Sequence, residues 1–131
     1  DDLEGIILPA IKAAAQEIAA SYGAQVEMHH YEPLFKDMRQ DKRLLELFKD
    51  VMTEFGESPR ILPDDEADGS TDVGNVSYEV PTAQPTLQIG LGLEAHTPEF
   101  TCAAGSDYGL DQAIKGAKIM AVVALRYAMH K

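Results

Sequence analysis

The sequence predicts an α/β fold with about three helices and three to four short strands. Three stretches carry apolar residues at helical spacing: residues 1–22, 41–55 and 107–130. Between them lie short runs that we expect to be strands: residues 25–31 and 86–90, in which apolar and polar residues alternate, and residues 59–62. Glycine or proline lies beside most of these runs, so we expect short elements separated by turns.

Length, composition and charge narrow the function classes. The chain has 131 residues, of which 45 % are apolar, so it can form the core of one ordinary domain. Its formal net charge of −11 argues against nucleic acid and anionic membrane surfaces as partners, because both attract a basic face. Cys102 is the single cysteine, so no intrachain disulfide can form. With no apolar run long enough for a membrane span, we expect a cytoplasmic protein.

The first helix is expected over residues 1–22, with Asp1 and Asp2 at its N-cap. Gly23 follows the last periodic residue, as a glycine at a helix C-terminus should. Pro9 conflicts with this helix because proline lacks a backbone donor, and it should kink the helix or delay its start. The apolar stripe consists of Ile7, Ile11, Ala14, Ile18 and Tyr22.

Residues 25–31 are expected to form a strand that packs antiparallel with this helix. His29 and His30 suggest a metal ion, but successive strand residues point to opposite faces and cannot easily share one ion. A structural or surface role for both is therefore favoured. Pro33 ends the strand, and a candidate domain boundary lies in the connector over residues 32–41.

The second helix is expected over residues 41–55, with Asp41 as its N-cap and Gly56 at its end. We expect its apolar stripe to lie in the core: Leu44, Leu45, Phe48, Val51, Met52 and Phe55. Residues 59–62 then form a short strand that Pro63 ends.

An acidic stretch over residues 64–75 partly matches a calcium-binding loop. Positions 1, 3, 5, 6 and 9 of the pattern fall on Asp64, Glu66, Asp68, Gly69 and Asp72. Position 12 is Asn75, where the pattern requires a bidentate glutamate. A solvated acidic loop is therefore favoured over a calcium site.

The last part of the chain carries a short helical turn over residues 74–81, a buried strand over 86–90, a long loop over 93–105 and a closing helix over 107–130. The closing helix is apolar on more than one side, so we expect it to be buried on two sides. Its main stripe comprises Leu110, Ile114, Ala117, Ala121, Leu125 and Ala128.

His96 lies in the loop before the closing helix, within the run HTPEF. An isolated histidine is more often structural than a ligand, but the loop over residues 69–75 could converge on the same edge of a sheet. Since a catalytic zinc site needs about three protein ligands, His96 cannot complete one. Ser70 lacks an adjacent base and Cys102 lacks an activating partner, so neither is favoured as a nucleophile.

Several runs in combination resemble a known family. They are GSTDVGNVS from Gly69, Pro81, Ile89-Gly90, HTPEF from His96 and IKGAKIMA from Ile114. Together they are similar to the C-terminal part of the co-catalytic, di-zinc type metal amidohydrolases and metallopeptidases. That family includes aminoacylases, carboxypeptidase G and the aminobenzoyl-glutamate hydrolases, and the last branch is the most similar.

The resemblance implies two domains and a site. Residues 1–35 would be the last helix and strand of a lid or dimerisation domain. Residues 36–131 would be the C-terminal part of a phosphorylase/hydrolase-like α/β catalytic domain. His96 would be the last metal ligand, and the substrate-pocket loop would comprise Gly69, Ser70, Thr71, Asp72, Gly74 and Asn75.

The resemblance also implies the chemistry. Two divalent ions, most often zinc, with manganese or cobalt as alternatives, would polarise the amide of a small peptide or N-acyl amino acid and activate a water. The parent enzyme would form a homodimer through its lid. The general base and the other ligands have no counterpart here and are expected upstream of Asp1, so this segment would hold no catalytic residue.

Two expectations about this chain remain. A 131-residue segment of such an enzyme should be inactive and, with apolar surface left open, should associate or be poorly stable. The alternative is a non-catalytic α/β module that binds a partner or dimerises.

Overall fold

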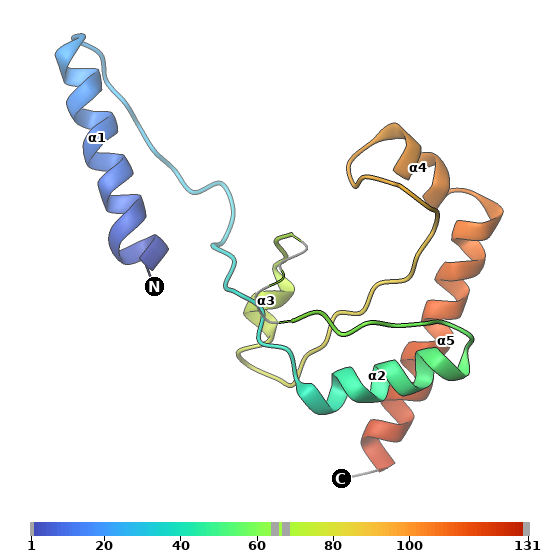
Figure 1. The fold of residues 1–131 in the computed structure, drawn as a ribbon. Helices are drawn as coiled ribbons and strands as arrows, with labels where there is room; N and C mark the ends of the chain where they lie inside the picture. Colours follow the sequence, from blue (N-terminus) through green and yellow to red (C-terminus); the bar gives the residue numbers. More distant parts are fainter. Residues whose placement is uncertain (1, 64–65, 67–68, 130–131) are drawn as a thin grey trace. The chain divides into compact units, whose positions relative to one another are not determined.

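The computed structural model describes residues 2–63, 66 and 69–129, which form helices and irregular segments (Figure 1). Within these ranges there is no strand, so the α/β prediction is wrong. The helices are the π-helix η1 (Leu3–Ile7), α1 (Leu8–Ser21), α2 (Lys42–Glu54), α3 (Val73–Val76), α4 (Pro98–Ala104) and α5 (Asp107–Met129).

The three expected strands, residues 25–31, 59–62 and 86–90, have no regular secondary structure. A strand exists only where a neighbouring strand pairs with its backbone. Among the described residues, no backbone hydrogen bond joins any of these runs to another segment. Alternation of apolar and polar residues indicates the direction in which side chains point. It does not indicate whether a partner strand lies alongside, so the pattern predicted more strands than the structure has among its described residues. Because residues 25–31 form no strand, the expected antiparallel packing of a strand with the first helix is wrong as well.

The chain divides into two compact units, residues 1–34 and 35–131. This division is based on contacts between residues of the chain, and it does not test what either unit does. The assignment of residues 1–35 to a lid and 36–131 to a catalytic domain stays a prediction.

In the first unit, Pro9 lies in the first turn of α1, directly after η1, and supplies no backbone N–H to the helix. The residues before it form the π-helical turn η1, so the α-helix starts later than residue 1, as Pro9 predicted. Asp2 lies at the predicted N-cap position, but its side chain makes no capping hydrogen bond, and Asp1 lies outside the described residues.

The end of α1 follows its sequence signal. Gly23 has φ +64°, its N–H donates to the Ala20 carbonyl, and the Ala24 N–H donates to the Ala19 carbonyl. This is a Schellman motif, which glycine favours because it adopts left-handed backbone without strain. The apolar stripe of the helix, however, is exposed, and α1 contains no buried residue.

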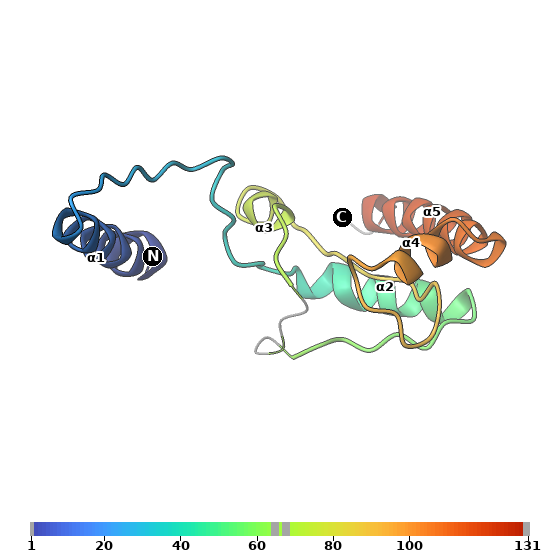
Figure 2. The ribbon, with the colours of Figure 1, turned by 90° about the horizontal axis from the view of Figure 1, so that it is seen from above.

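The second unit is built on α2 and α5, which pack side by side in both views (Figures 1 and 2). Its core contains Val51 and Met52 of α2 and Ile119 and Val123 of α5, all of them buried. Further apolar side chains surround these four: Leu44, Leu47, Phe48, Phe55, Leu87 and Val122.

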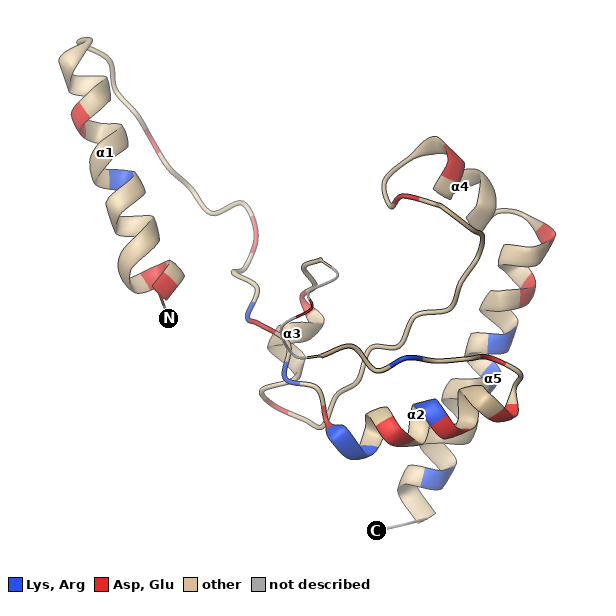
Figure 3. Ribbon diagram, in the orientation of Figure 1, with Lys and Arg blue, Asp and Glu red and all other residues tan. Residues whose placement is uncertain are grey.

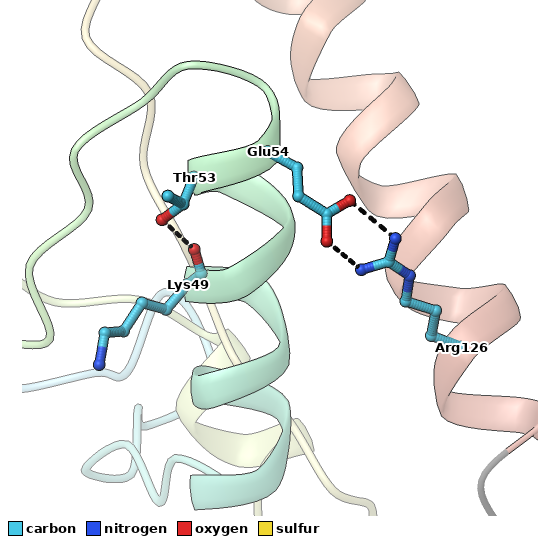
Figure 4. Close-up of polar contacts among 4 residues, drawn as sticks. All are labelled: Lys49, Thr53, Glu54 and Arg126. Atoms are coloured by element: carbon cyan, nitrogen blue, oxygen red, sulfur yellow. Dashed lines mark hydrogen bonds and ion pairs between the residues drawn. The ribbon is translucent and has the colours of Figure 1, made fainter.

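Polar contacts between α2 and α5 supplement this core. The Arg126 guanidinium donates to both Glu54 carboxylate oxygens, at 2.6 and 2.7 Å (Figure 4). This hydrogen bonding holds the pKa of the Glu54 carboxyl below its ordinary range. A second ion pair joins Lys115 to Glu57, just beyond the end of α2. Because the paired groups lie partly in water, we assign them a role in orienting the helices rather than a large stabilisation.

Both ends of α2 lie where the sequence places them. The Asp41 carboxylate accepts from the Leu44 N–H at 2.8 Å, as an N-cap does. At the other end Gly56 has φ +81°, and the Glu57 N–H donates to the Met52 carbonyl. These two predictions are confirmed.

The loop expected over residues 93–105 contains the helix α4. Its signals are ordinary ones that the prediction passed over: Thr97 accepts from the Phe100 N–H at 3.2 Å as N-cap, and Pro98 occupies the first turn. The turn into α5 is tight, since a Cβ on Gly109 would overlap the Ala103 carbonyl oxygen.

The closing helix α5 has the predicted extent but not the predicted burial. Its buried positions are Gly109, Gln112, Ile119 and Val123, of which Ile119 and Val123 pack in the core with α2. The predicted stripe lies on the other side and is exposed, with Ile114 at 56 % and Leu125 at 64 %. Burial on two sides is therefore wrong for the described residues, because α2 covers only one side.

Charged residues at the two ends of α5 suit the helix dipole, with Asp107 in the first turn and Arg126 in the last (Figure 3).

Among the described residues, no helix is long and apolar enough to cross a membrane.

Candidate functional site

The predicted pocket loop leads into α3. Gly69 has φ +140°, and the exposed Ser70 and Asp72 follow it. The Thr71 hydroxyl accepts from the Val73 N–H at 3.3 Å, which turns the chain into the helix. Gly74 is buried and Asn75 half-buried. The predicted loop residues thus divide into an exposed group and a packed group.

The packed group lies against residues 36–39, which sequence reasoning had not linked to it. The Asn75 Oδ1 accepts from the Lys36 N–H at 2.7 Å, and the Ser77 Oγ accepts from the Arg39 N–H at 2.9 Å. These partners lie 39 and 38 residues apart in sequence, so no local pattern could have predicted their contact.

Tyr78 extends the same contact. Its hydroxyl donates to the Asp37 carboxylate at 2.6 Å, and the Arg39 guanidinium lies 3.7 Å from its ring centroid. The hydrogen bond lowers the pKa of the Asp37 carboxyl and raises the pKa of the Tyr78 hydroxyl. Lys36 Nζ lies 4.7 Å from the same ring centroid, so two cations approach it.

His96 is exposed and has φ +64°, a left-handed conformation that few residues other than glycine adopt. Within the described part of the chain its ring makes no hydrogen bond, so both nitrogens are accessible. Thr97 directly after it caps α4 and also donates from its hydroxyl to the Glu94 carbonyl at 2.7 Å. The histidine backbone is therefore held at the entrance of a helix.

The structure does not bring His96 and the pocket loop together. Helix α3, at the end of the loop, makes no contact with α4, which follows His96, and Figures 1 and 2 show them apart. The sheet edge at which the two were expected to meet is absent from the described residues. Any joint role for them would require a further part of the protein.

The described residues do not form a metal site, since no group of three His, Cys, Asp or Glu side chains lies close enough to hold an ion. The imidazole of His96 suits a metal, but the remaining ligands are not supplied within the described ranges. His29 is exposed and pairs with Glu27 at 3.3 Å, in agreement with the surface role predicted for it. Cys102 is an exposed free thiol. The calcium pattern cannot be placed, because Asp64 and Asp68 lie outside the described residues.

A cavity of about 330 Å³ lies elsewhere, between α2, α5 and residues 85–89. Its walls are apolar, with Phe48 and Met52 from α2 and Ile119 and Met120 from α5. Gln112 on the same wall is buried, and its amide donates to the Gln88 carbonyl at 2.9 Å. The cavity contains neither His96 nor the pocket loop, so it belongs to the packing of this unit rather than to the predicted chemistry.

Similarity to known proteins indicates a protein class, which the geometry alone does not. The chain is 32 % identical over 114 residues to the Xaa-Arg dipeptidase of Mus musculus, a match that covers 87 % of this chain and 26 % of the relative. It is 44 % identical over 57 residues to the Xaa-Arg dipeptidase of Homo sapiens, over 44 % of this chain and 13 % of the relative. The chain is a distant homologue of a peptidase. No family model and no solved structure matches it.

The comparisons support the wider class that the motifs predicted, that of peptidases and amidohydrolases. They do not select the aminobenzoyl-glutamate hydrolase branch. The chain spans about a quarter of the length of the mouse relative and less of the human one.

Proposed function

We propose that this chain forms part of a metal-dependent dipeptidase, an enzyme that hydrolyses the amide bond of small peptides or N-acyl amino acids. The observation that carries the proposal is the similarity to an Xaa-Arg dipeptidase over 87 % of the chain. The same proposal includes a cytoplasmic location and a homodimer formed through residues 1–35.

His96 is the metal ligand proposed for this chain. Imidazole is a common metal ligand, the His96 ring is exposed, and the His96 backbone has a left-handed conformation just before α4. Strained backbone of this kind is found at functional sites, where the surroundings enforce it. A bound divalent ion would supply Lewis-acid polarisation of the scissile carbonyl and an activated water. The other ligands and the general base would come from outside the described residues.

The pocket loop is proposed to meet the substrate through its exposed end. The side chains of Ser70 and Asp72 are exposed. The name of the two relatives points to a substrate with a C-terminal arginine, and a carboxylate is the natural partner of its guanidinium. We therefore propose Asp72 as the residue that favours a cationic substrate.

The proposal is tested on the protein of full natural length. We expect metal-dependent hydrolysis of Xaa-Arg dipeptides that a chelator abolishes and that zinc, manganese or cobalt restores. His96→Ala should reduce activity by at least about 100-fold, since even residues that merely orient a ligand cost 10–100-fold.

Asp72→Asn should lower kcat/KM for arginine-terminated dipeptides by about tenfold, a loss of about 1.4 kcal/mol, and change the value for leucine-terminated ones little. The 131-residue chain without further sequence should show no activity. Hydrolysis by that chain, or full activity of His96→Ala, would contradict the proposal.

A further inference from the structure

The motif GSTDVGNVS has two ends with different surroundings. At one end the side chains of Ser70 and Asp72 are exposed. At the other end, Asn75 and Ser77 are half-buried, and each accepts a hydrogen bond from the backbone of residues 36–39. A side chain that is already bonded in this way is poorly placed to bind a substrate.

Gly74 shows how closely the two segments approach. It is buried, and a Cβ at this position would overlap the carbonyl oxygen of Lys36 and lie 3.4 Å from that of Asp37. Its φ is not left-handed, so glycine is required here for space and not for conformation. The Ser77 hydroxyl donates to the Gly74 carbonyl, which closes the same turn.

The Tyr78 side chain adds further contacts to these backbone hydrogen bonds. Its hydroxyl bonds to Asp37 while Arg39 lies over its ring, so the residues on both sides of Met38 are held. The Asp41 N–H continues the contact by donating to the Thr82 carbonyl at 2.8 Å. Residues 36–41 are thus joined to residues 74–82 along their length.

We propose that residues 36–39 form a brace for the pocket loop: Asn75, Ser77 and Tyr78 are positioning residues that fix residues 69–72, and they do not bind the substrate. The part of the proposal that concerns the substrate rests on the proposed function. It reassigns Asn75 and Gly74, which the motif had placed in the pocket, and leaves Ser70 and Asp72 as the specificity-determining end.

The brace is tested first by hydrogen exchange on the 131-residue chain. Asn75→Ala and Ser77→Ala should each accelerate amide exchange of residues 69–77 by about tenfold or more, because the closed loop opens more often. Ser77→Thr keeps the acceptor oxygen and should restore slow exchange. Ser70→Ala, at the exposed end, should leave exchange unchanged. Helix content by circular dichroism checks that α2 and α5 are intact in every variant.

Gly74→Ala is a second probe that removes no polar group. We expect it to accelerate exchange in residues 36–39 as well as in the loop, since the overlap pushes the two segments apart. If none of these three variants changes exchange in residues 69–77, the brace does not exist.

Kinetics on the full-length enzyme separate positioning from binding. Asn75→Ala and Ser77→Ala should lower kcat/KM equally for arginine-terminated and leucine-terminated dipeptides, with Ser77→Thr rescuing the loss. Asp72→Asn should change the ratio between the two substrates. A changed ratio in Asn75→Ala would mean that Asn75 contacts the substrate and would overturn its role as a positioning residue. If the enzyme hydrolyses no dipeptide, the proposed function fails, while the exchange data still decide whether the brace exists.

Discussion

At the scale of single residues, Asp37 and Tyr78 form a hydrogen bond that depends on two protonation states. The bond needs an ionised Asp37 and a protonated Tyr78, so it lowers one pKa and raises the other. Lys36 and Arg39 face the same ring. A lowered carboxyl pKa stabilises the fold above the pKa of the unfolded chain, and this contribution is lost as pH falls through the folded value. A raised tyrosine pKa contributes below its unfolded value and is lost as pH rises through the folded one.

Tyr78→Phe should therefore lower stability between about pH 5 and 9, bounded by the ordinary values of aspartate and tyrosine. The difference from the natural chain should shrink as pH falls through the lowered pKa of Asp37. Urea unfolding at several pH values measures it. Asp37→Asn is the matched control, because it should show a flatter dependence on pH in the acid range. A difference for Tyr78→Phe that stays constant down to pH 2 would contradict this account.

His96 shows what residue-level reasoning could and could not foresee about the site. Its motif and its loop identified it as a candidate ligand, and the structure shows it accessible. The left-handed backbone was not foreseen, because nothing in the residue type requires it. The helix that follows could have been foreseen, since Thr97 and Pro98 are ordinary signals of a helix start.

At the scale of elements, the two faces of α5 differ in burial but not in composition. Ile119 lies in the core at 2 % exposure, while Ile114 lies at 56 % on the opposite side of the same helix. Both belong to runs with helical spacing. The sequence indicates a helix that is apolar on both sides, and the packing of α2 selects which side is covered.

The pair provides a matched comparison of stability. Ile119→Ala should destabilise the second unit by about 2–5 kcal/mol, because it opens a cavity between α2 and α5. Ile114→Ala should change the free energy of unfolding by no more than about 0.5 kcal/mol, as exposed substitutions do. Urea unfolding followed by circular dichroism measures both. Equal losses would show that Ile114 is also covered in solution.

At the scale of the whole molecule, apolar side chains exceed the core that the described residues form. The fully buried apolar side chains are few, whereas large apolar residues are exposed in both units, including Ile11, Ile18, Ile114 and Leu125. Exposed apolar surface of this extent favours association. The expectation from sequence that the chain associates or is poorly stable remains a prediction.

We expect the purified 131-residue chain to self-associate as its concentration rises, measured by light scattering coupled to size-exclusion chromatography. Ile114→Lys, which adds charge to the exposed face of α5, should reduce the association without lowering stability. Lys118→Glu is a control, because it exchanges one exposed charge for another. If the natural chain and Ile114→Lys are both monomeric at all concentrations, this face does not mediate self-association.

The local features of this protein follow from its sequence. The extents of α2 and α5, the Asp41 cap and the glycine ends at Gly23 and Gly56 were predicted correctly, because each depends on residues within one or two turns. The family resemblance, carried by short motifs, was likewise sufficient to indicate a peptidase or amidohydrolase.

The remaining features depend on contacts between distant segments. The predicted strands at residues 25–31 and 86–90 found no partner, and the brace joins residues 36–39 to 74–78 across about 40 positions of chain. Neighbouring segments in space determine whether an extended run forms a strand. They also determine which face of an apolar helix is buried. Such contacts contribute free energy only when both segments are in place. The residue pattern of one segment therefore does not determine whether they form.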